Sequence, residues 1–208
     1  MEGKKIKRFF LNTYDLNKID INIGLKKIYQ QIYLTEINSN RNYPPNMSQS
    51  INSLGQKYYD PSFYTGTGGN IYIYWKQYLF HDRKKEYLDK FYQALTTNLT
   101  ISNSQKDKTN SFFMGKSGIY MFFCIYGLET KNKEIFKKFF MKLIELKRFS
   151  EEVNAELELL YGTTGYLYTL LFLKKYFFSL YIRKTNEKDM YQILDDTILE
   201  IFELLIIL

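Results

Sequence analysis

The densest group of acidic side chains in the sequence comprises Glu151, Glu152, Glu156 and Glu158. Two carboxyl groups can serve as the acid and the base or nucleophile of glycoside hydrolysis when a fold holds them at a productive separation. Nothing in the spacing of these four residues fixes such a separation. We therefore favour a solvated acidic turn beside a helix N-terminus and keep the hydrolytic hypothesis as an alternative.

The sequence contains one cysteine, Cys124, and one histidine, His81. A protein zinc site takes three or four ligands, mostly Cys and His. Cys124 lies in the apolar run 119–128 and His81 in the polar segment 81–83, so the two belong to different elements. We predict that Cys124 is a small core residue and that His81 is an exposed loop residue. We assign no catalytic, cofactor-binding or metal-binding residue to the chain, and a single Cys excludes an intrachain disulfide.

Three segments share a form, in which an aromatic residue precedes Gly-x-x-Gly and an apolar, Tyr-rich stretch follows. Their first glycines are separated by 49 and then by 47 residues. A glycine turn that opens a helix can present N–H groups to an anion, but it can also let the chain turn sharply into a packed helix. Because a folding device recurs whereas a ligand site usually occurs once, we favour the structural role. The glycines are Gly66 and Gly69, Gly115 and Gly118, and Gly162 and Gly165.

The segments after each glycine element follow one order, which predicts a repeated helical hairpin. Runs that are apolar on nearly every side predict buried inner helices at 71–80, 119–128 and 166–181. An amphipathic segment comes next, most clearly at 133–146, and predicts a half-exposed outer helix. No useful length alternates with period two, so we expect no sheet. Five tyrosines of the inner helices can line a central cavity or pack in the core: Tyr72, Tyr74, Tyr120, Tyr166 and Tyr168.

The composition is that of a globular protein. The 208 residues are 45% hydrophobic and 18% aromatic, which argues against disorder. We expect an N-terminal helix and a flexible linker containing Asn, Ser and Pro over residues 1–56, followed by one helical domain over residues 57–208.

The formal net charge of +7 is concentrated near the start, where residues 1–30 carry seven Lys and Arg against three Asp and Glu. A basic segment can contact anionic lipid, although a solvated lysine-rich surface is the reading we favour. The sequence shows neither a signal-peptide run nor a membrane-spanning stretch. We expect a cytoplasmic protein, with peripheral contact at the plasma membrane as an alternative, and no nucleic-acid partner.

Three motifs together resemble those of eukaryotic LanC-like (lanthionine synthetase C-like) proteins. Tyr64-Thr65-Gly66 with Gly69 resembles the Tyr-Thr-Gly-x-x-Gly element of that family, and Ser111 to Gly118 is similar to its Thr-Phe-x-x-Gly-x-x-Gly element. The most specific likeness runs from Glu158 to Phe172, similar to Glu-x-Leu-Tyr-Gly-x-x-Gly-Tyr-x-Tyr-x-Leu-Leu-Phe. The positions that carry the resemblance are Tyr64, Gly66, Gly69, Gly115, Gly118, Glu158, Tyr161, Gly162, Gly165 and Tyr166.

The resemblance implies an all-α fold, an α/α toroid in which inner and outer helices alternate around a ring. Family members are about twice as long, so we expect about half a ring here. In eukaryotic members, zinc held by two Cys and one His activates glutathione for addition to dehydroalanine or dehydrobutyrine residues of proteins. Those ligand motifs are missing from this sequence, so we expect a truncated form that is inactive by itself. The alternative is a non-catalytic glutathione- or peptide-binding, or membrane-peripheral, helical module.

An incomplete ring leaves its end helices without neighbours. The sequence ends in the apolar stretch Leu204 to Leu208. We therefore expect oligomerisation or aggregation through the uncapped ends.

Overall fold

The computed structural model describes residues 49–51, 57–104, 109–152, 155–181 and 188–207. All of them belong to one unit, residues 43–208, and the second unit, Met1–Asn42, lies outside the described residues. The predicted N-terminal helix, most of the predicted linker and the basic segment 1–30 therefore also lie outside them. The expectations about those segments remain predictions.

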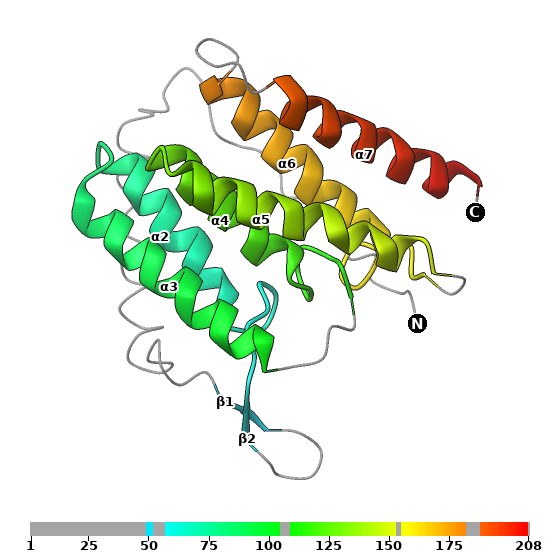
Figure 1. Cartoon of the computed structure of the whole chain (residues 1–208). Coiled ribbons are helices and arrows are strands. Elements are labelled where there is room, and N and C mark those ends of the chain that lie inside the picture. The colour runs from blue at the N-terminus through cyan, green and yellow to red at the C-terminus, as the bar shows by residue number, and fades with distance from the viewer. Residues whose placement is uncertain (1–48, 52–56, 105–108, 153–154, 182–187, 208) are drawn as a thin grey trace, which may run out of the picture. The chain divides into compact units, whose positions relative to one another are not determined.

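The described helices form three consecutive hairpins that lie side by side (Figure 1). A short 3-10 helix, η2, follows the second hairpin. This order is the repeat that the glycine spacing predicts, so the all-α class and the hairpin architecture are confirmed. The elements are α2 (Gly68–Phe80) with α3 (Lys85–Asn103), α4 (Ser117–Glu129) with α5 (Lys133–Glu145), η2 (Leu146–Ser150), and α6 (Thr163–Tyr181) with α7 (Lys188–Ile207).

A two-stranded antiparallel ribbon precedes the helices. Strand β1 (Gln49–Ile51) pairs with β2 (Lys57–Tyr59), with Gln49 opposite Tyr59. The expectation of no sheet was wrong at this point. Strands of three residues are shorter than the window over which an alternating pattern can be recognised.

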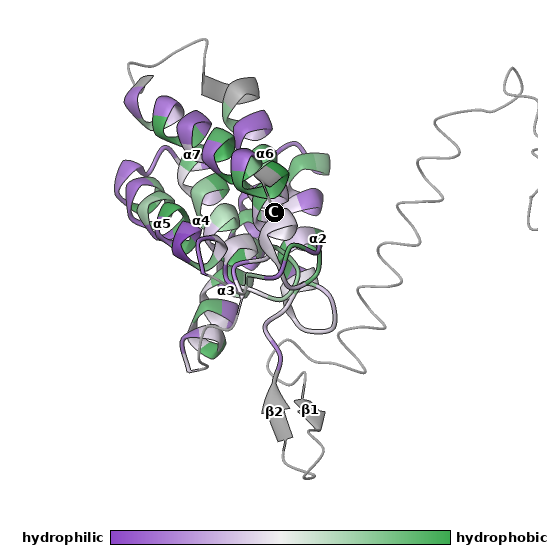
Figure 2. Cartoon of the chain, turned by 90° about the vertical axis from the view of Figure 1, so that its right-hand side faces the viewer, coloured by the Kyte–Doolittle hydropathy of each residue, from purple (hydrophilic) through white to green (hydrophobic). Residues whose placement is uncertain are grey.

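Helix α4 is the centre of the helical array. Of its 13 residues, 11 are buried, and the hydropathy colours show little purple on it, whereas the outer sides of α5 and α7 are purple (Figure 2). The ring of Phe122 lies 5.4 Å from Trp75 of α2, 6.0 Å from Phe91 of α3 and 6.2 Å from Phe172 of α6, between ring centroids. All three hairpins therefore share one aromatic core.

Helix α5 packs closely along α4. The rings of Phe123 and Phe139 stack with centroids 3.9 Å apart. Gly127 allows this approach, because a Cβ there would lie 2.7 Å from the backbone nitrogen of Phe136. The side chain of Asn132 accepts a hydrogen bond of 3.0 Å from the backbone N–H of Ile135 and so caps α5, a contribution of about 1 kcal/mol.

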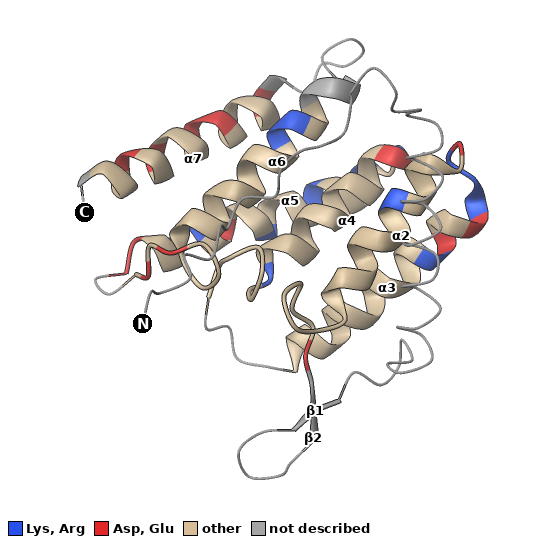
Figure 3. Cartoon of the chain, turned by 180° about the vertical axis from the view of Figure 1, so that it is seen from behind, with Lys and Arg blue, Asp and Glu red and all other residues tan. Residues whose placement is uncertain are grey.

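Helix α7 combines a buried stripe with an exposed apolar one. Leu199, Phe202 and Ile206 are exposed, and acidic residues are spaced along the same helix (Figure 3). Lys147 of η2 holds α7 through a 2.6 Å ion pair with Glu200. Among the helices described, none has both the length and the apolarity that crossing a bilayer requires.

Candidate functional site

All three glycine elements stand at the starts of α2, α4 and α6, as predicted. A Cβ at Gly162 would lie 2.0 Å from the carbonyl oxygen of Glu156, and a Cβ at Gly66 would lie 2.1 Å from that of Asp60. Each glycine therefore makes room for the backbone six residues before it. The N–H of Thr163 donates to the same Glu156 oxygen at 2.7 Å. A loop carbonyl thus occupies the place an anion would take, which supports the structural role.

The other glycines of the three elements differ in how closely neighbouring atoms approach the place of a Cβ. Gly69 is the loosest, since the nearest atom to a Cβ there is the carbonyl oxygen of Phe63 at 4.0 Å. At the other three positions a Cβ would come within 3 Å of loop atoms, so a side chain would displace the loop. These positions are Gly115, Gly118 and Gly165.

A side-chain oxygen caps each loop four residues before its first glycine. Ser62 accepts from the N–H of Thr65 at 3.2 Å, and Ser111 accepts from that of Met114 at 3.1 Å. At the third loop, the carboxylate of Glu158 takes this place and accepts from the N–H of Tyr161. The family glutamate is therefore a turn cap, equivalent to the two serines.

The other carboxylates of the acidic cluster lie at the surface. Glu151 pairs with Lys147 at 3.1 Å, and Glu152 and Glu156 are exposed. With Glu158 engaged by a backbone N–H, this arrangement is a solvated acidic turn. It supports that interpretation over the hydrolytic one.

The three glycine loops lie side by side at one end of the inner helices. The N–H of Phe63 donates to the carbonyl oxygen of Phe113 at 2.8 Å, and the N–H of Phe112 donates to that of Gly165 at 3.3 Å. Tyr64 and Tyr161, which precede the first glycine of their elements, are exposed. Backbone hydrogen bonds therefore link each repeat to the next.

Cys124 and His81 do not form a zinc site. Cys124 is fully buried within α4, as predicted, and burial raises the pKa of its thiol well above the usual value, so it stays protonated. His81 is half-buried instead of exposed, because its ring stacks on Tyr87 with centroids 4.3 Å apart. Within the described part of the chain, no three His, Cys, Asp or Glu side chains are grouped to hold a metal. The donor set therefore does not fit the zinc that the family resemblance implies.

A hollow lies between the inner helices α2 and α6, and we call it the aromatic groove. Its volume is about 500 Å³. The Trp75 ring lies 5.7 Å from the rings of both Phe172 and Tyr176, so residues of α2 and α6 meet across it. It is lined by Trp75, Lys76, Tyr168, Leu171, Phe172, Lys175 and Tyr176.

Behind the aromatic groove, the carboxylate of Glu129 gathers donors from three segments. It accepts from the hydroxyl of Tyr176 of α6, from that of Tyr78 of α2 at 3.1 Å, and from Nε of Arg83 at 3.0 Å. The Glu129 side chain is 4% exposed. Burial and then the Glu129 carboxylate raise the pKa of Tyr78 to about 12, and burial and the Glu129 hydrogen bond raise that of Tyr176. Both tyrosines therefore remain hydrogen-bond donors.

Arg83 reaches this cluster from an unusual turn. Asp82 and Arg83 both have positive φ, 51° and 59°, a conformation that costs about 1 kcal/mol or more for a residue with a side chain. The N–H of Arg83 donates to the carbonyl oxygen of Tyr78 at 2.9 Å. This turn and the ion pair with Glu129 hold Arg83 at the end of α2.

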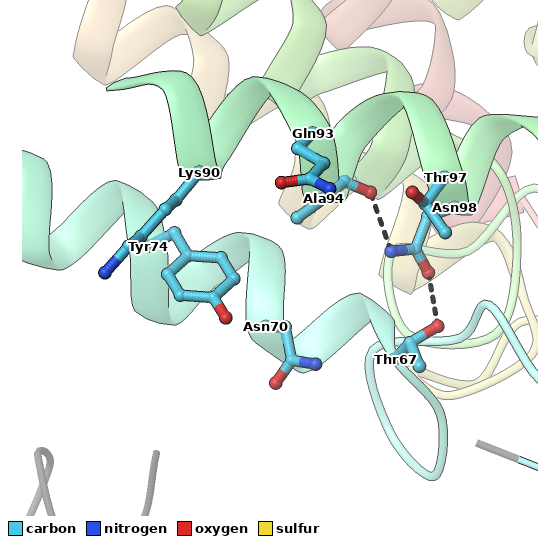
Figure 4. Close-up of a pocket in the computed structure, with 8 residues that line it drawn as sticks. All are labelled: Thr67, Asn70, Tyr74, Lys90, Gln93, Ala94, Thr97 and Asn98. Carbon is cyan, nitrogen blue, oxygen red and sulfur yellow. Dashed lines mark hydrogen bonds between the residues drawn. The ribbon is translucent and has the colours of Figure 1, made fainter. Parts of the chain in front are cut away.

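A second, smaller hollow lies between α2 and α3 (Figure 4). Its volume is about 140 Å³. At one end, the hydroxyl of Thr67 donates to Oδ1 of Asn98 at 2.7 Å, and Nδ2 of Asn98 donates to the carbonyl oxygen of Ala94 at 2.8 Å. These groups satisfy one another, so the hydrogen-bond chain joins α2 to α3.

The five tyrosines of the inner helices divide between cavity and core. Tyr168 lines the aromatic groove and is 42% exposed, as the cavity interpretation expects. Tyr72 is 39% exposed, and its ring lies 5.6 Å from that of the lining residue Trp75. Tyr74, Tyr120 and Tyr166 are buried. The hydroxyl of Tyr166 donates to the carbonyl oxygen of Leu143 at 2.8 Å, which ties α6 to α5.

The family model for lanthionine synthetase C-like proteins matches residues 57–205, more than two thirds of the chain. This chain belongs to the lanthionine synthetase C-like family. A comparison with curated proteins gave no match. The LanC-like match begins at the first residue of β2 and ends within α7, so it includes the glycine loops and the aromatic groove.

Of the residues that form the aromatic groove of this LanC-like chain, several were not identified from the sequence. Trp75, Lys76 and Lys175 border the aromatic groove, and Glu129 with Arg83 supports it from behind. One available signal was a lysine on an otherwise apolar inner helix, since such a residue marks an uncovered side. The convergence on Glu129 left no local signal in the sequence.

Proposed function

We propose that this LanC-like chain is a peptide-binding module of the family's thiol-addition chemistry, with the aromatic groove as its binding site. The reaction in question adds the thiol of glutathione to dehydroalanine or dehydrobutyrine residues of proteins. The observation that carries the proposal is the groove itself, a hollow of about 500 Å³ between two inner helices, with lysines on both sides. That volume is in the range of small-ligand sites.

The lining suits a small anionic peptide. Glutathione carries two carboxylates, and Lys76 and Lys175 offer two ammonium groups across the hollow. The exposed side chains of Tyr168 and Leu171 and the half-buried ring of Phe172 provide an apolar surface for the rest of a peptide, and the buried ring of Trp75 supports them. The lining includes no carboxylate that would repel an anion.

The described residues supply binding and not the bond-forming step. Zinc chemistry in the family delivers a thiolate, yet Cys124 is sealed within α4 as a protonated thiol and His81 stands at the end of α2. We therefore assign no step of the reaction to a residue of this chain. The proposal is the non-catalytic binding role.

Intrinsic fluorescence tests the proposal directly, because Trp75 is the only tryptophan of the chain. Titration with glutathione and with a short dehydroalanine peptide should change the Trp75 emission in a saturable way. The double variant Lys76→Gln/Lys175→Gln should weaken the response to glutathione, whereas Lys137→Gln, an exposed lysine of α5, should leave it unchanged. An emission that neither compound changes would contradict the proposal.

A further inference from the structure

The two lysines of the aromatic groove differ from other lysines of the same region in their surroundings. Lys174 pairs with Asp195 of α7 at 2.5 Å, and Lys147 pairs with Glu151 and Glu200. Lys175, one residue after Lys174, lines the groove instead, where no carboxylate is present. The positive charge of Lys174, on the side of α6 that faces α7, is thus neutralised by Asp195. The positive charge of Lys175, on the groove side of α6, has no carboxylate among the lining residues.

The ammonium group of Lys76 lies over two aromatic rings. Its Nζ lies 4.6 Å from the centroid of Trp75 and 5.4 Å from that of Tyr72. A cation over the face of a tryptophan is attracted by the ring, so the ammonium group stays at the groove wall. The Trp75 ring beneath it is only 3% exposed, so a ligand carboxylate that reaches Lys76 brings its neighbouring atoms onto the exposed side chains of the lining, Tyr168 and Leu171.

The surface between the two lysines, which we call the floor of the groove, is mostly apolar, with Tyr168 and Leu171 exposed on it and Trp75 buried beneath. The hydroxyl of Tyr176 donates to Glu129 behind the groove, so Tyr176 offers its ring to a ligand. Phe172 lies between, with its centroid 6.1 Å from that of Tyr168 and 5.7 Å from that of Trp75. Such a floor favours an aromatic or large aliphatic side chain, which buries apolar surface there.

Charge and floor together point to one ligand class, and we propose that the groove selects peptide segments in which an aromatic side chain is flanked by acidic residues. This rests on the proposed function, because it names which peptides that site accepts. The aromatic side chain lies against Tyr168, Leu171 and Phe172. The flanking carboxylates meet Lys76 and Lys175. Glutathione, which has no aromatic side chain, would use the lysines alone.

Four blocked tripeptides separate the two parts of this recognition in titrations followed by Trp75 fluorescence and calorimetry. Asp-Phe-Glu should bind about ten-fold more tightly than Asn-Phe-Gln, since each exposed ion pair contributes up to about a factor of five. Asp-Ala-Glu should bind about ten-fold more weakly than Asp-Phe-Glu, because it lacks the aromatic ring. Lys-Phe-Lys should bind most weakly of the four. Raising the salt concentration should weaken only the acidic peptides.

Single variants assign the effect to the groove. Lys76→Gln and Lys175→Gln should each weaken Asp-Phe-Glu about three-fold, and together they should make Asp-Phe-Glu and Asn-Phe-Gln bind alike. Lys137→Gln on α5 is the matched control and should change nothing. Equal affinity for Asp-Phe-Glu and Asn-Phe-Gln in the unaltered protein would overturn the proposal, as would an indifference to both lysine substitutions.

The outcomes also distinguish this inference from the proposed function. If Asp-Phe-Glu binds and glutathione and the dehydroalanine peptide do not, the selectivity stands and the LanC-like role fails. If glutathione binds through the lysines while the four tripeptides bind alike, the role stands and the selectivity fails. A Trp75 response to phosphatidylserine vesicles but to no peptide would overturn both in favour of a membrane surface.

Discussion

Replacing Glu129 with alanine should destabilise the protein strongly, because the Glu129 side chain is 4% exposed and accepts three hydrogen bonds. The change removes the common acceptor of the Tyr78 and Tyr176 hydroxyls and the partner of Arg83. A hydrogen bond to a charged group contributes about 1.5–3 kcal/mol. The Arg83 side chain is 53% exposed, so its ion pair adds no more than about 1 kcal/mol.

These contributions do not simply add, because the substitution also removes a charge whose burial is unfavourable. We expect Glu129→Ala to lower the free energy of unfolding by about 3 kcal/mol. Arg83→Ala should cost about 1 kcal/mol, since both tyrosines continue to donate to the carboxylate. Urea denaturation followed by far-ultraviolet circular dichroism gives these values, with the m-value showing whether the unfolding remains two-state.

The matched control is Glu203→Ala, which removes an exposed glutamate of α7 and should change stability by less than about 0.5 kcal/mol. A double-mutant cycle of Glu129→Ala with Tyr176→Phe should give a coupling of about 1 kcal/mol or more. A loss below about 1 kcal/mol for Glu129→Ala, or additivity in the cycle, would refute the idea that this carboxylate joins three hairpins.

Three further changes test other parts of the structure. Gly162→Ala should cost about 1–3 kcal/mol because its Cβ would meet the carbonyl oxygen of Glu156, whereas Gly69→Ala should be nearly neutral; equal melting temperatures for the two variants would contradict the close-approach argument. Stability should fall as pH rises from 10 towards 12, because Tyr78 titrates near 10 when unfolded and at about 12 when folded; Tyr78→Phe should flatten that slope in denaturation at several pH values. Cys124 should resist a thiol reagent until the protein unfolds, because it is fully buried; fast labelling of the native protein would show that α4 is accessible.

The hairpin architecture could be predicted because each of its parts has a signal in a short stretch of sequence. The intervals of 49 and 47 residues between glycines give the length of one unit, and the change from an all-apolar to an amphipathic pattern gives its two helices. The close approach at Gly162 and Gly66 explains why the glycines recur. The ribbon was missed because three-residue strands have no recognisable period.

The aromatic groove could not be derived in the same way. Trp75 and Phe172 lie almost a hundred positions apart, and only the packing of α2 and α6 over α4 brings them together. Glu129 follows an apolar run and reads as an ordinary polar helix end. Its role depends on the positions of Tyr78 and Tyr176, which lie on two other helices. No local sequence pattern specifies those positions.

The seclusion of α4, with 11 of its 13 residues out of contact with solvent, has a consequence for how the molecule opens. An amide proton in that helix can reach deuterated water only when the surrounding hairpins separate from it, so its exchange should report the whole-molecule transition. Helix α7 packs mainly against α6 and η2, at the edge of the described array, so its amide protons should exchange through smaller openings. The slowest-exchanging amides of α4 would then give the free energy of unfolding of the whole array.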